Sequence, residues 1–162
     1  MKPVRAAAVA LLLLVGCGEA TTPDAAPTTS TSTTAPRPKI EPIGDLPSPR
    51  AGVERPSPDH LVHGQAGWGV YLAVARTTSG TGDVDTSAWD AAVAELEERG
   101  FPLEGDGGEI GCDGDPALEA FADVDADWGT AVYFLDRADA DAYAASLDPA
   151  PRVVPVTYFC AD

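Results

Sequence analysis

The chain has 162 residues and carries 26 acidic against 10 basic residues, which gives a formal net charge of −16 at pH 7. The imbalance is concentrated from residue 56 onward, where four arginines and no lysine stand against 21 acidic residues. Nucleic-acid binding depends on Lys and Arg side chains that neutralise phosphates, so this charge argues against a nucleic-acid partner. It also disfavours direct adhesion of the folded part to anionic lipid headgroups.

The start of the chain has the pattern of a secretory signal. Two basic residues, Lys2 and Arg5, precede an apolar run over residues 6–15. The run is shorter than the ~20 apolar residues that a membrane-spanning helix needs. We therefore expect a signal peptide over residues 1–16 that is removed on export.

The end of that signal, Leu14-Val15-Gly16-Cys17, resembles the bacterial lipobox. The resemblance implies cleavage before Cys17, a lipid on its sulfur, and anchoring at the extracytoplasmic face of the cell membrane. Two or more acyl chains, such as palmitate, hold a protein stably at a bilayer, whereas a single chain binds only marginally. The alternative is an ordinary signal peptide followed by a chance cysteine.

The segment after the lipid anchor, residues 17–58, is rich in Thr, Ser and Pro. Such a composition buries too little apolar surface to offset the entropy lost on ordering, so we expect a disordered stalk. Three sparse apolar residues, Ile40, Ile43 and Leu46, are the ones able to dock on the folded part. An acidic α+β domain is expected over residues 59–162.

The first half of this domain shows one strand pattern and one helix pattern. The predicted strand covers residues 68–75, where apolar and β-branched residues predominate. A helix follows, which Asp85 or Thr86 caps and Gly100 ends. The expected buried stripe of this helix consists of Trp89, Ala92, Val93 and Leu96.

The middle of the domain gives weaker signals. Glycines over residues 103–115 break any periodicity and allow only a short strand at 109–112. Asp115, followed by Pro116, opens a short helix that extends to about residue 122. We expect a turn after this helix.

The C-terminal part predicts a strand at residues 129–135, a helix capped by Asp136 and a last strand at 152–160. The inner face of this helix consists of Ala140, Tyr143, Ala144 and Leu147. Pro155 removes one hydrogen-bond donor from the last strand, which should therefore lie at a sheet edge.

The order of these elements predicts an α+β fold with an antiparallel or mixed sheet of three or four strands. Two helices lie on one face, as in a ferredoxin-like sandwich, and the short helix near residues 115–122 is an extra element. Sequence alone does not decide the order of the strands.

The chain has three cysteines, so one is left over from any pairing. If Cys17 is lipidated, Cys112 and Cys160 remain, and outside the cytoplasm two such cysteines usually form a disulfide. Two free thiols are the alternative. A disulfide conflicts with the ferredoxin-like strand order, in which the second and fourth strands form opposite sheet edges. Either residues 109–112 are not the second strand, or the order differs.

An acidic repeat, Asp123, Asp125 and Asp127, has the alternating spacing that opens a calcium-binding loop. Trp128 and Phe134 occupy the positions where an EF-hand requires glycine and glutamate, so an EF-hand is rejected. A looser cation site and a solvated acidic turn remain the alternatives.

The only two histidines, His60 and His63, lie three residues apart beside Asp59. On a helix that spacing suits metal ligation, and an enzyme would need one of the two near an acid. No nucleophile motif accompanies them, and we expect no cofactor.

The alternation of side chains along strands places Tyr71 and Tyr133 on the sheet face opposite the two helices. If that face is open, the two rings form a platform for a sugar or a peptide. If the end of the stalk or the helix near residues 116–122 covers the face, the rings are part of a second core.

The segment that begins Asp136-Arg137-Ala138-Asp139-Ala140, between two strands, is similar to the repeated half of the SPOR domain, a peptidoglycan-binding domain. The resemblance implies a ferredoxin-like fold and binding of cell-wall glycan across an open sheet face. It covers about 30 residues, and the first half of the domain lacks the motif, so no binding residue is carried over.

Together these patterns predict a membrane-anchored, extracytoplasmic lipoprotein whose domain is a non-catalytic binding or interaction module for an unknown extracytoplasmic protein. Binding of cell-wall glycan (peptidoglycan) is the second hypothesis. Binding of a divalent cation, or enzymatic activity, is the third.

Overall fold

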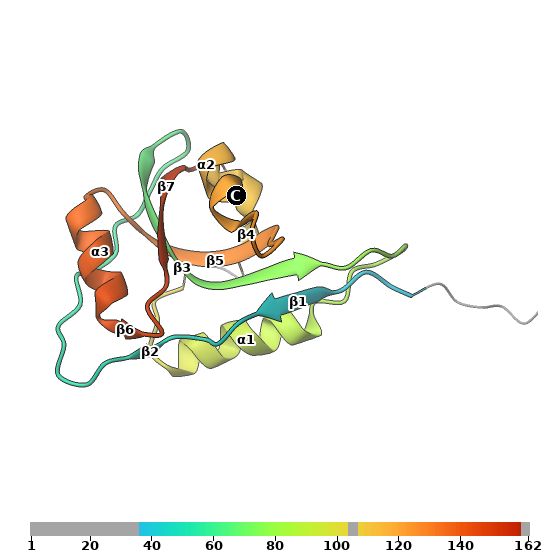
Figure 1. The fold of residues 1–162 in the computed structure, drawn as a ribbon, viewed down its shortest axis with the longest axis horizontal. Coiled ribbons are helices and arrows are strands. Elements are labelled where there is room, and N and C mark those ends of the chain that lie inside the picture. Colours follow the sequence, from blue (N-terminus) through green and yellow to red (C-terminus); the bar gives the residue numbers. More distant parts are fainter. Residues whose placement is uncertain (1–35, 104–106, 160–162) are drawn as a thin grey trace, which may run out of the picture. The chain divides into compact units, whose positions relative to one another are not determined.

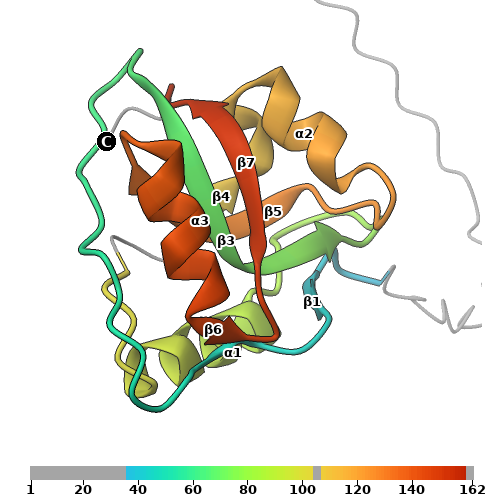
Figure 2. The same cartoon turned by 60° about the vertical axis from the view of Figure 1, so that its left-hand side comes forward.

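The computed structural model describes residues 36–103 and 107–159. Helices pack on both faces of an antiparallel sheet (Figures 1 and 2). The helices are α1 (Ser87–Glu98), the 3-10 helix η1 (Ile110–Asp113), α2 (Asp115–Phe121) and α3 (Arg137–Ala145). The strands are β1 (Ile40–Ile43), β2 (Ser48–Pro49), β3 (Ala66–Thr77), β4 (Gly108–Glu109), β5 (Trp128–Phe134), β6 (Leu147–Asp148) and β7 (Arg152–Thr157).

The signal peptide, Cys17 and the first part of the predicted stalk lie outside the described residues. The same is true of Cys160.

The sheet is built around β3, its longest strand. β5 pairs with one edge of β3, and β4 pairs with the other edge of β5. On its second side β3 pairs with β7 along residues 66–71 and with β1 along residues 74–77. All of these pairings are antiparallel, and β2 and β6 form a separate two-stranded ribbon. The main sheet therefore has five strands rather than the three or four expected from the sequence.

The second half of the predicted stalk belongs to the fold. Ile40 in β1 is only 2% exposed, and Leu46 packs against the same core. Arg99 donates hydrogen bonds to the carbonyl oxygens of Leu46 (2.7 Å) and Pro47 (2.9 Å). The expected domain start at residue 59 is therefore too late. The few apolar residues of this segment are stabilised by strand pairing and burial that its composition does not reveal.

One face of the sheet is covered by α1 and α3, as predicted. The expected inner residues of α1, and Ala140, Tyr143 and Ala144 of α3, are buried, because their 3.6-residue spacing directs them at the sheet. Leu147 is buried too, but it lies in β6, beyond the end of α3. This first core contains Val70 and Leu72 from β3 and Val132 and Phe134 from β5. The start of α3 also follows the sequence. The Asp136 carboxylate accepts a hydrogen bond from the Ala138 amide (2.7 Å).

The other face is covered by η1 and α2, which form a second core with β3, β5 and β7. Ala117 and Phe121 of α2 are buried there, so the extra helix predicted from Asp115 and Pro116 is present. Gly114 rather than Asp115 is its N-cap residue. Figures 1 and 2 show α2 on the side of β3 and β5 away from α1.

The predicted strand at residues 109–112 is largely wrong. Only Gly108–Glu109 pair with β5, and the chain then turns into η1, which lies on the second face. β4 and β7 lie toward opposite sides of the sheet, but Cys112 lies in η1 rather than in the edge strand. In the described part of the chain β7 pairs only with β3, which confirms that the strand containing Pro155 is an edge strand.

Candidate functional site

The two tyrosines predicted to share a sheet face meet at one buried carboxylate. The Tyr71 hydroxyl donates a hydrogen bond to Oδ2 of Asp113, and the Tyr133 hydroxyl lies 3.1 Å from the same oxygen. Asp113 is 4% exposed and Tyr71 is 5% exposed. We call these three residues the Asp113 cluster.

Burial decides the protonation behaviour of this cluster. Loss of solvent raises the pKa of Asp113 above its ordinary value, while the hydroxyls of Tyr71 and Tyr133 oppose this rise by hydrogen bonding to the charged form. Burial, followed by the nearby Asp113 carboxylate, also raises the pKa of Tyr71. The cluster joins η1 to the sheet through hydrogen bonds between buried side chains.

The predicted aromatic platform is therefore not an open surface. The Tyr71 ring packs edge-on against Phe121 of α2, with centroids 4.7 Å apart, and Tyr133 packs against Tyr158. The alternative in which the short helix covers this face is the one that the structure has. A ligand that stacks on Tyr71 would have to displace η1 and α2.

Cys112 is disulfide-bonded. Asp113 follows Cys112 in the sequence, and both lie in η1. The disulfide and the Asp113 cluster therefore hold the same short helix. The Phe159 amide donates a hydrogen bond to the Cys112 carbonyl oxygen (2.8 Å), which brings the end of the described chain to η1. The pairing of Cys112 with Cys160 remains a prediction, because Cys160 lies outside the described residues.

The acidic repeat after α2 does not converge on a cation site. Asp123 forms a two-pronged ion pair with Arg152, with both N–O distances 2.7 Å. Asp127 instead accepts a hydrogen bond from the Thr77 amide (2.8 Å). Asp125 lies in the turn with φ of 55°. Among residues 36–103 and 107–159, no group of three or more His, Cys, Asp or Glu side chains could hold a metal ion.

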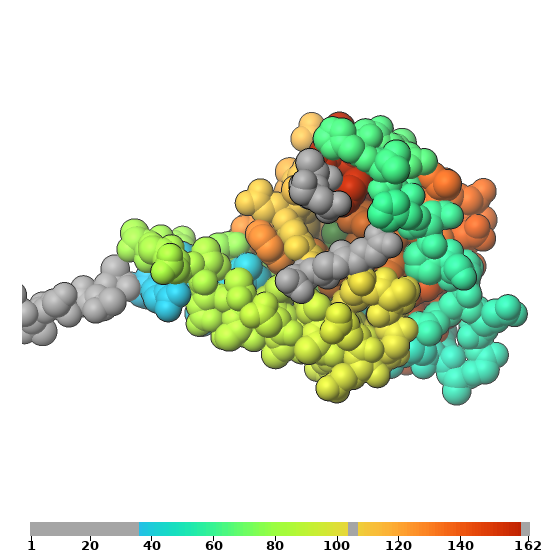
Figure 3. Space-filling model, turned by 180° about the vertical axis from the view of Figure 1, so that it is seen from behind, coloured from blue at the N-terminus to red at the C-terminus, as the bar shows by residue number. Residues whose placement is uncertain are grey.

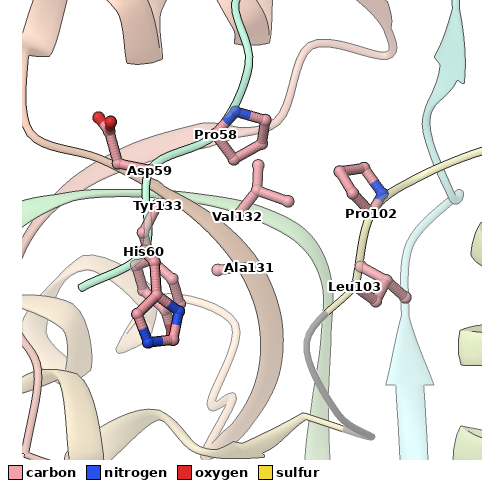
Figure 4. Close-up of a pocket in the computed structure, with 8 residues that line it drawn as sticks. All are labelled: Pro58, Asp59, His60, Pro102, Leu103, Ala131, Val132 and Tyr133. Atoms are coloured by element: carbon pink, nitrogen blue, oxygen red, sulfur yellow. The ribbon is translucent and has the colours of Figure 1, made fainter. Parts of the chain in front are cut away.

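A pocket of about 220 Å³ lies at the edge of β5 that faces β4. Its floor is formed by β5, and its walls come from the segment before β3 and from the segment after α1 (Figure 4). Figure 3 shows these two wall segments, coloured teal and yellow, on the face seen from behind. The residues that line it are Pro58, Asp59, His60, Pro102, Leu103, Ala131, Val132 and Tyr133. We call it the β5-edge pocket.

Asp59 holds one wall of this pocket in place. Its amide donates to the Tyr133 carbonyl oxygen (2.8 Å), and its carboxylate accepts from the Leu135 amide (2.8 Å). Figure 4 shows the Asp59 carboxylate and the His60 ring on opposite sides of the backbone. Asp59 therefore acts as a strand-pairing residue rather than as an acid beside His60.

The two histidines do not share a site. His60 lines the β5-edge pocket, whereas the His63 ring packs edge-on against Phe159, with centroids 5.9 Å apart. They lie in an irregular segment rather than on the helix that joint metal ligation would need.

A second hollow, of about 240 Å³, lies at the gap between β7 and β1 along β3. Arg152 is the cation in its lining, and its guanidinium is already bound by Asp123 and by the Ala120 carbonyl oxygen. We take the β5-edge pocket as the candidate ligand site, since the guanidinium that the second hollow could offer is already engaged.

The sequence marks Tyr133, His60 and Asp59 as candidates, but not as parts of one pocket. Pro58, Pro102, Leu103 and Ala131 carry no sequence signal of a binding site, because they read as loop or strand residues. Three separate segments form this pocket, and no local signal joins them.

Comparisons of the chain with protein-family models, with curated proteins and with solved structures found no match. No helix within the described stretches is long and apolar enough to cross a membrane.

Proposed function

We propose that this protein is a non-catalytic, extracytoplasmic binding module, anchored to the cell membrane through Cys17, and that its ligand binds in the β5-edge pocket. The observation that carries the proposal is a pocket on β5 whose walls include Pro58, Pro102 and Leu103. Ligand sites are usually concave with mostly apolar walls, because such walls exclude water from the polar contacts of the ligand.

The side chains around the pocket favour recognition over chemistry. Asp59 is engaged with two backbone groups of β5 and turns away from His60. Pro58, Pro102 and Leu103 present apolar surface. The walls therefore provide shape and desolvation.

For the core we propose a ferredoxin-like arrangement. The strand order β7–β3–β5–β4, with α1 and α3 on one face, supports it. The glycan-binding surface that the SPOR resemblance implies would be the face occupied here by η1 and α2. We therefore place the ligand at the sheet edge instead.

The anchor makes a prediction of its own. Cells fed radiolabelled palmitate should incorporate label into the wild-type protein and none into Cys17→Ser, because the thioether forms on that sulfur. The protein is isolated by immunoprecipitation and label is read after electrophoresis. Label on the Cys17→Ser protein would contradict the lipobox assignment.

The pocket is tested in the cells that export the protein. We expect a photo-crosslinking benzoylphenylalanine at His60 to give adducts with an envelope component, because this exposed residue lines the β5-edge pocket. The same group at Thr81, exposed in the loop after β3, should give none. Adducts are read as shifted bands on an immunoblot of the full chain.

A blocking variant sharpens this test. Pro102→Trp places a large ring at the exposed wall of the pocket and should abolish the adducts formed from position 60. Thr81→Trp is its matched control and should leave them unchanged. Equal adducts from positions 60 and 81, or none from either, would count against the pocket.

A further inference from the structure

The second hollow, of about 240 Å³, lies where two strands leave the same side of β3. β7 pairs with β3 along residues 66–71, and β1 pairs with it along residues 74–77. Pro151, just before β7, has no amide N–H with which to continue the pairing. Gly44, just after β1, has a left-handed φ of 80°, a conformation that glycine adopts readily. The chain therefore leaves β3 on both sides of the two intervening residues, and every residue that lines the hollow belongs to the described part of the chain.

The walls of the second hollow are mostly apolar. The apolar side chains come from the segment after β1, the end of α2 with the turn that follows it, and the segment before β7: Ile43, Pro47, Phe121, Val124, Pro149 and Pro151. Arg99 holds the first of these segments by its hydrogen bonds to the carbonyl oxygens of Leu46 and Pro47. The hollow is smaller than a pocket for a drug-sized ligand, so it suits a compact hydrocarbon group.

Two charged side chains, Arg152 and Asp45, also line the hollow. The Arg152 guanidinium is neutralised by Asp123 and stacks on the Phe121 ring, 5.2 Å from its centroid. Asp45 takes part in none of the ion pairs of the described residues, which include all eight Lys and Arg residues after Cys17. The hollow therefore presents one negative charge that no basic side chain compensates.

This combination selects the chemistry of a ligand. Ca²⁺ and Mg²⁺ take six or more oxygen ligands, and one carboxylate among apolar walls supplies too few. Asp45 and the excess of acidic residues from residue 56 onward repel an anion. An organic cation fits both features, because its hydrocarbon part covers the apolar walls while its charge stays at the exposed Asp45.

We propose that the second hollow binds a small organic ammonium ion, with the hydrocarbon group between the apolar walls and the ammonium group donating to the Asp45 carboxylate. No residue lines both this hollow and the β5-edge pocket, so neither proposal depends on the other.

The test uses the mature chain, residues 17–162, carrying Cys17→Ser so that it stays in solution without lipid. The probe is cyclohexylammonium, and binding is followed by ¹H–¹⁵N NMR titration. We expect the amide resonances of Gly44, Ala73 and Ala150, which line the hollow, to shift. Cyclohexanol should bind more weakly than the ammonium ion, and cyclohexanecarboxylate more weakly still. No shift at these three residues would overturn the proposal.

A pair of charge variants tests the role of Asp45. Asp45→Asn should weaken binding of cyclohexylammonium by about 2- to 5-fold, the range for an exposed ion pair, and leave binding of cyclohexanol unchanged. Asp83→Asn removes the same charge from an exposed position in the loop after β3 and should change neither. Equal losses in the two variants would mean that net charge rather than Asp45 attracts the ion, which would overturn the proposal.

A blocking variant tests the place of binding. Ala150→Trp puts a large ring at an exposed position in the lining and should abolish the shifts at Gly44 and Ala73, whereas Thr81→Trp should leave them. Shifts that persisted in Ala150→Trp would contradict binding in the hollow. If Ala150→Trp does not fold, the comparison of Asp45→Asn with Asp83→Asn decides, because both replace exposed residues.

Discussion

Replacing Cys112 by Ser should lower the free energy of unfolding of the mature chain by about 2 to 4 kcal/mol. Cys112 is disulfide-bonded, and a predicted pairing with Cys160 closes a loop that contains α2, β5, α3 and β7. Opening that loop restores conformational freedom to the unfolded chain, which accounts for most of the loss in the loop-entropy model. Urea denaturation of the chain carrying Cys17→Ser measures the change.

The identity of the partner cysteine follows from the same experiment. Cys160→Ser should lower stability by the same amount as Cys112→Ser, and the double variant should lose no more than either single one, because all three lack the same bond. If Cys160→Ser left the domain as stable as the parent, Cys112 and Cys160 would not be linked in it. Non-reducing mass spectrometry then identifies the linked peptides.

The regular elements of this fold were predictable because each carries its own periodicity. Trp89, Ala92, Val93 and Leu96 recur at helical spacing, so α1 and its buried face could be expected from the sequence. The apolar run of the long central strand and the capping residue Asp136 at the start of α3 are equally local signals.

The short strands were missed for a physical reason. β1, β2 and β4 have two to four residues each, and pairing with distant strands rather than intrinsic preference stabilises them. Ile40 is a single apolar residue in a Pro-rich segment, yet it is buried against the first core. Composition averages over such a segment and misses the one side chain that docks.

The candidate site was harder still to predict. The alternation of side chains along the strands correctly placed Tyr71 and Tyr133 on one face. Whether that face is open depends on where η1 and α2 pack on the sheet. The β5-edge pocket exists because Asp59, 74 residues before Tyr133 in the sequence, pairs with it across the sheet edge. Such a contact has no sequence signature.

Replacing Tyr71 by Phe should lower the free energy of unfolding by about 1 to 3 kcal/mol, because it leaves a buried oxygen of Asp113 without its hydrogen-bond donor. The Phe ring retains the packing against Phe121, so the change isolates the hydroxyl that donates to Asp113. Urea denaturation again measures the effect. In an Asp113→Asn background the same substitution should have a different cost, because the hydroxyl then loses an amide rather than a carboxyl partner.

The pH dependence of the Asp113 cluster has a definite sign. Burial raises the pKa of Asp113 in the folded state, so the folded chain holds this proton more tightly than the unfolded chain, in which the pKa is about 3.9. The stability that Asp113 contributes is therefore fully present below that value and is lost as the pH rises through the folded-state pKa. Acids whose pKa is lowered, such as Asp123, act in the opposite direction.

Asp113→Asn separates these contributions, because the amide keeps a similar shape and does not titrate. The stability of the wild type minus that of Asp113→Asn should fall as the pH rises from 3 to 8, with the other carboxylates cancelling in the difference. A difference that stayed constant would mean that burial and the hydrogen bonds from Tyr71 and Tyr133 balance. A difference that rose with pH would mean that the hydrogen bonds outweigh burial, so that the Asp113 cluster favours the charged carboxylate.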